Sequence, residues 1–269
     1  MPAKLCKKSH GHARPARYNI GMDTPVTACL IIIGNEILSG RTQDKNLAYL
    51  AEKLNSAGVR LLEARVIPDI EETIIATVNA CRAAHHYVFT TGGIGPTHDD
   101  ITSASVAKAF GVALIRHPEA VRLLEKEYAA RDVPLNEARL RMADVPEGAT
   151  LIPNAVTAAP GFKIGNVHVL AGVPRIMQAM LDTILPDLRG AGPMHALSVK
   201  TNLPEGTLAD GLATIQAQFP EVEIGSYPQF LPAGYTTTLV SRAYDASAAE
   251  QAHAAIQQLI GELDGKIVD

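Results

Sequence analysis

The feature that most constrains the fold is an uninterrupted apolar segment at residues 27–33, which ends at Gly34. A strand that is apolar at every position must be buried on both faces, as central strands of parallel sheets are. Strand-like and helix-like patterns then alternate along the chain, which favours a parallel sheet with helices on both faces. We predict strands over residues 27–33, 59–67, 87–91 and 167–170, and helices over 46–57, 71–83, 102–110, 118–131, 135–142 and 174–188.

The order of elements changes after a Gly- and Pro-rich linker at residues 190–193. The pattern there is strand, helix, two strands, helix and strand, which is the split βαββαβ order of a ferredoxin-like domain. We predict these elements over residues 195–201, 205–218, 221–227, 235–242, 246–262 and 264–268. The chain is therefore expected to comprise a basic N-terminal extension (1–22), a three-layer α/β/α domain (23–190) and a small α+β domain (194–269).

The amino-acid composition is that of a globular protein rather than a disordered, disulfide-rich or membrane-spanning one. A hydrophobic fraction of 47% and a charged fraction of 19% are typical of a folded globular chain. The three cysteines form no CxxC pair, which argues against a disulfide framework or a thiolate zinc site and fits a reducing cytoplasm. Cys29 and Cys81 fall in strand and helix patterns and are predicted to be core residues. No apolar segment approaches the ~18 residues that a membrane span needs, so we expect a cytoplasmic protein with no membrane partner.

The first 22 residues differ from the rest. They contain five basic residues and no acidic one, whereas the chain as a whole has a net charge of −4. Two interpretations stay open: a disordered tail, or a native start at Met22; a transit peptide is disfavoured by the scarcity of serine. The acidic body, the absence of Trp and the aromatic fraction of 4% argue against a nucleic-acid partner.

Three glycine-containing turns follow predicted strands of the first domain, at residues 34–36, 91–100 and 171–175. Ligands of open parallel sheets bind beyond the carboxyl ends of the strands, so these turns are expected to share one edge. Glycines let the backbone N–H groups of a loop curl around an anion, and the following helix N-terminus favours the same charge. The middle turn therefore predicts a phosphate site.

The middle turn also carries two carboxylates, Asp99 and Asp100. Carboxylates repel phosphate unless a cation lies between them, so we expect a divalent ion, Mg²⁺ first. The alternative is helix capping, but Thr102 can cap the helix by itself, which leaves at least one aspartate without a structural role.

The outer turns add further candidates. Glu36 is a candidate ligand or metal contact, while Asp44 is equally well explained as the N-cap of the helix that starts at Asn46. In the third turn, Pro174 suits a first helical position, and Arg175 either neutralises phosphate charge or is simply exposed.

The histidines show no metal-ligand spacing. His98 lies inside the glycine loop and is a possible ligand contact, whereas the others are expected at the surface or at strand ends: His85, His86, His117, His168 and His195. The sequence contains no nucleophile elbow, Walker A loop or Rossmann glycine fingerprint.

Residues 33–40, 44–46 and 91–102, in this order, resemble the motifs of the MoaB/Mog-type molybdenum-cofactor biosynthesis (molybdopterin-binding) domain. Residues 154–162 and 172–174 are similar to its CinA N-terminal branch, named after competence/damage-inducible protein A. The resemblance covers about residues 27–190. The segment 225–228 resembles the region that follows this domain in eukaryotic FAD synthases.

The resemblance implies a MoaB/Mog-like α/β/α fold with a mostly parallel sheet, a pterin or nucleotide ligand, and dimers or trimers. In Mog-type enzymes the glycine loop holds molybdopterin, and an aspartate matching Asp100 supports Mg²⁺-dependent adenylyl transfer. The CinA branch is associated with cleavage of ADP-ribose-type pyrophosphates, and the FAD synthase version with FAD hydrolysis. The chain departs from the CinA pattern at Ala171 and at Arg175-Ile176, which alters charge beside the expected phosphates.

We therefore predict a catalytic pair, Asp100 and Asp99, and a metal site at Asp100 and Glu36. The predicted ligand-binding residues are Gly34, Asn35, Glu36, Asp44, Asn46, Thr91, Gly92, Gly93, Gly95, Pro96, Thr97, Gly172, Pro174 and Arg175. The favoured function is a Mg²⁺-dependent pyrophosphatase acting on an ADP-ribose- or FAD-type substrate. The alternatives are molybdopterin adenylyl transfer, a binding module without turnover, and an interaction scaffold that works through the C-terminal domain.

Overall fold

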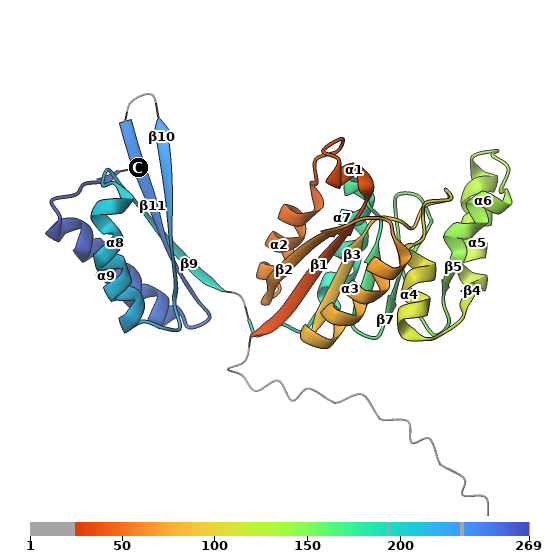
Figure 1. Cartoon of the computed structure of the whole chain (residues 1–269), viewed down its shortest axis with the longest axis horizontal. Coiled ribbons are helices and arrows are strands. Elements are labelled where there is room, and N and C mark those ends of the chain that lie inside the picture. Colours follow the sequence, from red (N-terminus) through yellow and green to blue (C-terminus); the bar gives the residue numbers. More distant parts are fainter. Residues whose placement is uncertain (1–24, 193, 232–233, 269) are drawn as a thin grey trace, which may run out of the picture.

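The computed structural model describes residues 25–192, 194–231 and 234–268, which build two main sheets with their helices (Figure 1). The basic segment 1–22, together with Cys6, lies outside these residues, so its predicted disorder stays a prediction. No helix in the described part of the chain combines the length and the apolar character that crossing a membrane requires.

The larger sheet has six strands in the order β2-β1-β3-β8-β7-β6. β2, β1, β3 and β8 pair in parallel, whereas β7 pairs antiparallel with both β8 and β6. The predicted mostly parallel sheet is confirmed. β6 and β7, which have three and four residues, are not among the strands predicted from the sequence. The strands are β1 (Val26–Ile33), β2 (Val59–Ile67), β3 (Tyr87–Thr91), β6 (Thr150–Ile152), β7 (Gly161–Ile164) and β8 (Val167–Leu170).

Helices cover both faces of this sheet (Figure 1). Alternate residues of β1 show why the strand is apolar throughout: Leu30 and Ile32 pack with α2 and α7, whereas Cys29, Ile31 and Ile33 pack with α3 and α4. Each of these five residues is at most 4% exposed. A short helix, α1, follows β1 where the sequence indicated only a turn. The helices are α1 (Asn35–Leu38), α2 (Asn46–Ser56), α3 (Glu71–Ala84), α4 (Thr102–Phe110) and α7 (Pro174–Ile184), with a 3₁₀ turn η2 (Leu185–Asp187).

Between α4 and β6 the chain forms a small lobe of its own, residues 114–146, which packs around Leu124. The prediction of one helix over 135–142 is wrong in extent. Asn136 caps a helix of four residues by accepting from the Arg139 N–H at 3.0 Å, and the chain then tightens into a 3₁₀ turn to enter β5. The lobe contains β4 (Leu114–Arg116), α5 (Pro118–Ala130), α6 (Glu137–Leu140), η1 (Arg141–Ala143) and β5 (Asp144–Pro146).

The C-terminal sheet is antiparallel, with strand order β10-β11-β9-β12. Two helices follow its first and third strands, so the predicted βαββαβ order is confirmed. The hairpin strands extend further toward each other than predicted, whereas the last strand is shorter because Asp264 adopts a left-handed conformation, with φ of 55°, after α9. The elements are β9 (His195–Thr201), α8 (Glu205–Gln218), β10 (Glu223–Leu231), β11 (Gly234–Ala243), α9 (Ala246–Glu262) and β12 (Ile267–Val268).

One histidine contradicts the expectation of surface or strand-end positions. His168 lies inside β8, only 2% exposed, and stacks on Phe89 with ring centroids 5.1 Å apart. Burial lowers the pKa of His168 to about 4, so the imidazole is neutral at physiological pH.

Candidate functional site

The three glycine turns meet at the carboxyl ends of β1, β3 and β8. The Gly92 N–H donates to the Leu170 carbonyl at 3.3 Å. A Cβ on Gly92 would lie 2.1 Å from the Ile33 carbonyl oxygen, and one on Gly172 would lie 3.2 Å from the Gly92 Cα. The loops therefore touch through their backbones, which only glycine at these positions permits.

The middle loop also needs left-handed backbone at two consecutive residues, because φ is +103° at Gly92 and +68° at Gly93. Thr102, at the start of α4, stabilises this loop conformation with two hydrogen bonds. Its hydroxyl donates to the Gly92 carbonyl and its N–H to the Gly93 carbonyl, both at 3.0 Å. The prediction that Thr102 caps α4 is wrong: it braces the glycine loop, and none of the described side chains caps this helix.

A cavity of about 590 Å³ opens beside the glycine loop, a size within the range of small-molecule sites. One wall comes from predicted residues at the strand ends: Glu36, Gly92, Gly93, Gly95, Pro96, Asp100, Gly172 and Pro174. The opposite wall comes from the 114–146 lobe and the loop after β6: Glu127, Tyr128, Arg131, Met142, Asn154, Thr157 and Ala159.

Most of the opposite wall was not found by reasoning from the sequence. Tyr128 and Arg131 stand at the end of α5, a helix whose pattern shows amphipathicity but no chemistry. Arg131 is the only cation among the described residues that line the cavity, and it pairs with Glu127. The guanidinium of Arg139 lies 5.0 Å from the centre of the Tyr128 ring and holds that ring in place. Only the segment 154–162 gave a signal, through its family resemblance.

The two aspartates of the middle loop take different positions. Asp100 lines the cavity, and its Oδ2 accepts from the N–H and the hydroxyl of Thr97 at 2.8 and 2.5 Å. Asp99 is exposed, with its Oδ1 3.9 Å from Nδ1 of the exposed His98. Hydrogen bonding with the Thr97 side chain also lowers the pKa of the Asp99 carboxyl, which is therefore ionised at neutral pH.

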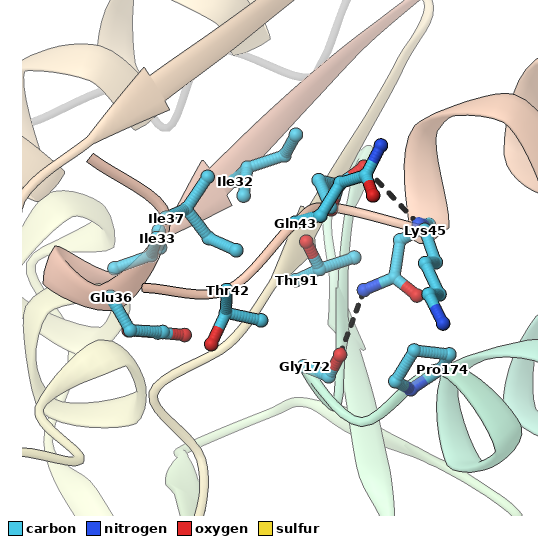
Figure 2. Close-up of a pocket in the computed structure, with 12 residues that line it drawn as sticks. Ile32, Ile33, Glu36, Ile37, Thr42, Gln43, Lys45, Thr91, Gly172 and Pro174 are labelled. Atoms are coloured by element: carbon cyan, nitrogen blue, oxygen red, sulfur yellow. Dashed lines mark hydrogen bonds between the residues drawn. The ribbon is translucent and has the colours of Figure 1, made fainter. Parts of the chain in front are cut away.

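A second, smaller cavity of about 60 Å³ adjoins the first and shares Glu36, Gly172 and Pro174 with it. Figure 2 shows Glu36 on one side, Lys45 and Pro174 on the other, and Thr91 between them. The side chain of Asn46 is 3% exposed, and its Nδ2 donates to the Gly172 carbonyl at 2.8 Å.

Two buried polar atoms belong to the lining residues of this small cavity. Oδ1 of Asn46 and Oγ1 of Thr91, which is 1% exposed, have no hydrogen-bond partner among the described residues. Buried polar atoms without partners are costly, so these two are the atoms that a ligand or water would satisfy.

Two aspartates outside the large cavity, Asp44 and Asp69, stabilise the backbone between β1 and α2. Asp44 does cap α2: its Oδ1 accepts from the N–H groups of Asn46 and Leu47 at 3.2 and 2.9 Å. Asp69 precedes α3 but does not cap it. Its Oδ2 accepts from the Asn35 N–H at 2.8 Å and ties the turn after β1 to the end of β2.

The remaining predicted residues lie at the edge but do not line either cavity: Gly34, Asn35, Thr97, Asp99 and Arg175. Arg175 is exposed in the first turn of α7. The positively charged side chain that lines the large cavity is that of Arg131.

Asp100 and Glu36 are compatible with Mg²⁺, because this ion typically takes one or two protein carboxylates and completes its shell with phosphate and water. Both residues line the same cavity. Within residues 25–192, 194–231 and 234–268, no third His, Cys, Asp or Glu joins them in a cluster of three. The pair suits Mg²⁺ only when phosphate oxygens supply further ligands.

Comparisons with known proteins fit this geometry. Residues 29–190 match the family model described as a probable molybdopterin binding domain, and residues 193–267 match the middle domain of FAD synthase. A protein of Pyrobaculum calidifontis is 37% identical over 214 residues, which are 76% of this chain and 82% of that protein. A CinA-like protein of Desulfosudis oleivorans is 33% identical over 212 residues, 75% of this chain but only 51% of that protein.

Among solved structures, that of CinA from Thermoplasma acidophilum, a protein of unknown function, matches with a TM-score of 0.56 and 33% identity. The match covers 60% of this chain and 96% of that one. Because the first family model spans more than half of the sequence, the chain belongs to the probable molybdopterin-binding domain family.

Proposed function

We propose that this protein binds a pterin or adenine-nucleotide pyrophosphate in the large cavity and hydrolyses its phosphoanhydride with Mg²⁺. The observation that carries the proposal is that Asp100 and Glu36 line the same cavity as the glycine loop. A phosphate held by that loop faces two carboxylates, and only a shared cation makes this combination favourable.

The rest of the cavity suits a flat ring system. Its lining is rich in apolar side chains from both walls: Ile94, Pro96, Tyr128, Met142, Ile176 and Met180. Such a surface buries a pterin, adenine or flavin ring, while the neighbouring loop takes the phosphates. The unpartnered Asn46 Oδ1 and Thr91 Oγ1 offer hydrogen bonds to a polar edge of the ligand in the smaller cavity.

In this proposal the residues divide the work. The backbone of Gly92, Gly93 and Gly95 binds phosphate oxygens, and Arg131 neutralises charge on the leaving group. Asp100 and Glu36 hold the cation, which, when bound, polarises the phosphoanhydride and lowers the pKa of a coordinated water. Water then adds to one phosphorus as the bridging P–O bond breaks, which yields two monophosphates.

A binding module without turnover is the second candidate, and one observation favours it. Asp99 does not line the cavity, and Oδ2 of Asp100 already accepts from two donors of Thr97. In a module, the carboxyl of Asp100 would serve mainly to fix the loop.

The test starts from a thermal-shift panel of ADP-ribose, FAD, ATP and molybdopterin, each with and without Mg²⁺, followed by product analysis of the ligands that stabilise. Hydrolysis predicts nucleoside monophosphate from ADP-ribose or FAD, whereas adenylyl transfer predicts pyrophosphate and adenylylated molybdopterin from ATP. Asp100→Asn is expected to lower turnover by about a hundredfold or more while the ligand still binds without Mg²⁺.

Asp99→Asn is the matched comparison, since it makes the same change one residue away and outside the cavity. We expect it to alter turnover by less than about threefold. Binding of all four ligands without any product, in the wild type and in both variants, would establish the binding module instead.

We also infer a homo-oligomer. β2 is an edge strand of the larger sheet, and it exposes Leu62 and Val66 by 52% and 42%. An apolar edge strand tends to be covered by another chain. Leu62→Lys should then shift the mass measured by light scattering toward the monomer, and an unchanged mass would remove this edge as the interface.

A further inference from the structure

Two cysteines that lie far apart in the sequence come together on the α3 side of the larger sheet. Cys29 of β1 and Cys81 of α3 are both fully buried, and their Sγ atoms are 3.2 Å apart. Spacing along the sequence argued against a thiolate metal site, because it shows no CxxC pair. The packing of α3 against β1 brings the two thiols together, although no sequence motif indicates the pair.

A carboxylate completes a set of three donors. Glu63 lies on β2 directly beside Cys29, its partner in the parallel register. One ligand atom from each of Cys29, Glu63 and Cys81 lies within 4.8 Å of the other two. In the part of the chain that the structure describes, this is the only group of three or more such side chains that could hold a metal.

The two cysteines lie in the hydrophobic core, whereas Glu63 adjoins charged and polar side chains. His85, which follows α3, has Nε2 3.3 Å from the Glu63 carboxylate, and its side chain is 9% exposed. Its Nδ1 has no hydrogen-bond partner among the described residues. Arg65 donates to both oxygens of Glu63, at 2.8 and 3.2 Å.

We propose that Cys29, Cys81 and Glu63 bind a thiophilic divalent cation, Zn²⁺ first. Two thiolates, one carboxylate and one guanidinium sum to a charge of −2, which a divalent cation neutralises. Thiolate sulfur, imidazole nitrogen and carboxylate oxygen are the donors that Zn²⁺ takes in proteins, at distances of about 2.0 to 2.3 Å. Around such an ion two sulfurs lie roughly 3.7 Å apart, so the thiol pair needs to open only slightly.

Binding would release the two thiol protons to solvent, with no change of oxidation state. Cys29 stands four residues before the end of β1, about 13 Å from the glycine loops. The site would therefore clamp β1, β2 and α3 together and stay outside the proposed chemistry.

The experiment titrates Co²⁺ into the full chain without oxygen, in a Cys6→Ser background so that Cys29 and Cys81 are the remaining thiols. Two bound thiolates give an intense near-ultraviolet charge-transfer band, and tetrahedral geometry gives strong visible bands. We expect both, saturating at one Co²⁺ per chain and displaced by one equivalent of Zn²⁺.

Cys81→Ser should abolish most of the charge-transfer band, and Glu63→Gln should weaken Zn²⁺ binding by at least about tenfold. Circular dichroism checks that both variants fold, and Glu63→Gln is the safer of the two because Glu63 is half-exposed. The proposal is overturned if the Cys6→Ser chain gives no charge-transfer band, or if Zn²⁺ binding survives in Cys81→Ser.

Discussion

Gly92 is the residue on which the three loops of the candidate site converge. Its φ of +103° is costly for any L-residue with a side chain, and a Cβ there would lie 2.1 Å from a backbone oxygen of β1. Backbone atoms cannot swing away as a flexible side chain can, so the loop itself would have to move. A substitution at Gly92 should therefore affect both stability and ligand binding.

We expect Gly92→Ala to lower the free energy of unfolding by about 3 kcal/mol, from strained backbone together with the steric clash. Gly111→Ala is the matched control: its φ is +67°, but nothing lies within 4 Å of the added Cβ. This control should cost about 1 kcal/mol. Urea unfolding measures both, and equal losses would contradict the close packing at Gly92.

Thr91 and Thr90 offer a second matched pair. Both hydroxyls are buried without a hydrogen-bond partner among the described residues, but only Thr91 lines the smaller cavity. Thr91→Val should weaken binding of the stabilising ligand by about tenfold, because a hydrogen bond is worth about 1 kcal/mol or slightly more. Thr90→Val should leave affinity unchanged. Isothermal titration calorimetry measures the ligand affinity of both variants. Equal affinities of the two variants would show that the ligand does not reach Thr91.

At the scale of elements, the pairing of β3 and β8 buries an ionisable ring. The pKa of His168 falls to about 4 because burial removes its charged form from water, and the neighbouring Lys163 adds repulsion. The unfolded chain takes up a proton near pH 6.5, whereas the folded chain resists it until about pH 4. This contribution to stability is present above pH 6.5 and is lost as the pH falls between these values.

The stability lost over that interval should be about 3 kcal/mol in the wild type. In His168→Phe, which keeps a ring against Phe89, this part of the pH dependence should disappear. Urea unfolding at several pH values between 7 and 4 measures the difference. Identical slopes for the two proteins would mean that His168 is protonated in the native state.

At the scale of the whole molecule, the two main sheets have separate hydrophobic cores. The two clusters of the larger sheet contain residues up to Ala191, and the clusters of the C-terminal sheet begin at Val199. The ion pair between Arg60 of β2 and Glu223 of β10 links the two parts, but both side chains are about 40% exposed, so the pair contributes at most about 1 kcal/mol.

Residues 1–192 expressed alone should therefore fold and melt cooperatively, within a few degrees of the corresponding transition in the full chain. Calorimetry with circular dichroism measures this. Turnover or ligand binding that survives in this fragment argues against an interaction scaffold that works through the C-terminal part. An unfolded fragment would show that the two parts stabilise each other.

Most helices and strands, and the shared edge of the three glycine turns, could be predicted from local patterns in the sequence. These predictions rest on short segments: the apolar strand β1, the glycines after β1, β3 and β8, and the order of the C-terminal strands. The periodicity of apolar residues and the conformational freedom of glycine can both be recognised within a few residues. Parallel strands then bring their carboxyl ends to one edge whatever their side chains are. That is why Glu36, Asp100 and Gly172 could be assigned to one rim.

Which side chains face one another could not be predicted, because it depends on how distant elements pack. Arg131 and Tyr128 of the 114–146 lobe line the cavity together with the glycine loop, and of the two adjacent aspartates only Asp100 lines it. Cys29 and Cys81 meet across 52 residues of chain. Such contacts depend on how whole elements pack, and no spacing within a short stretch of sequence records that.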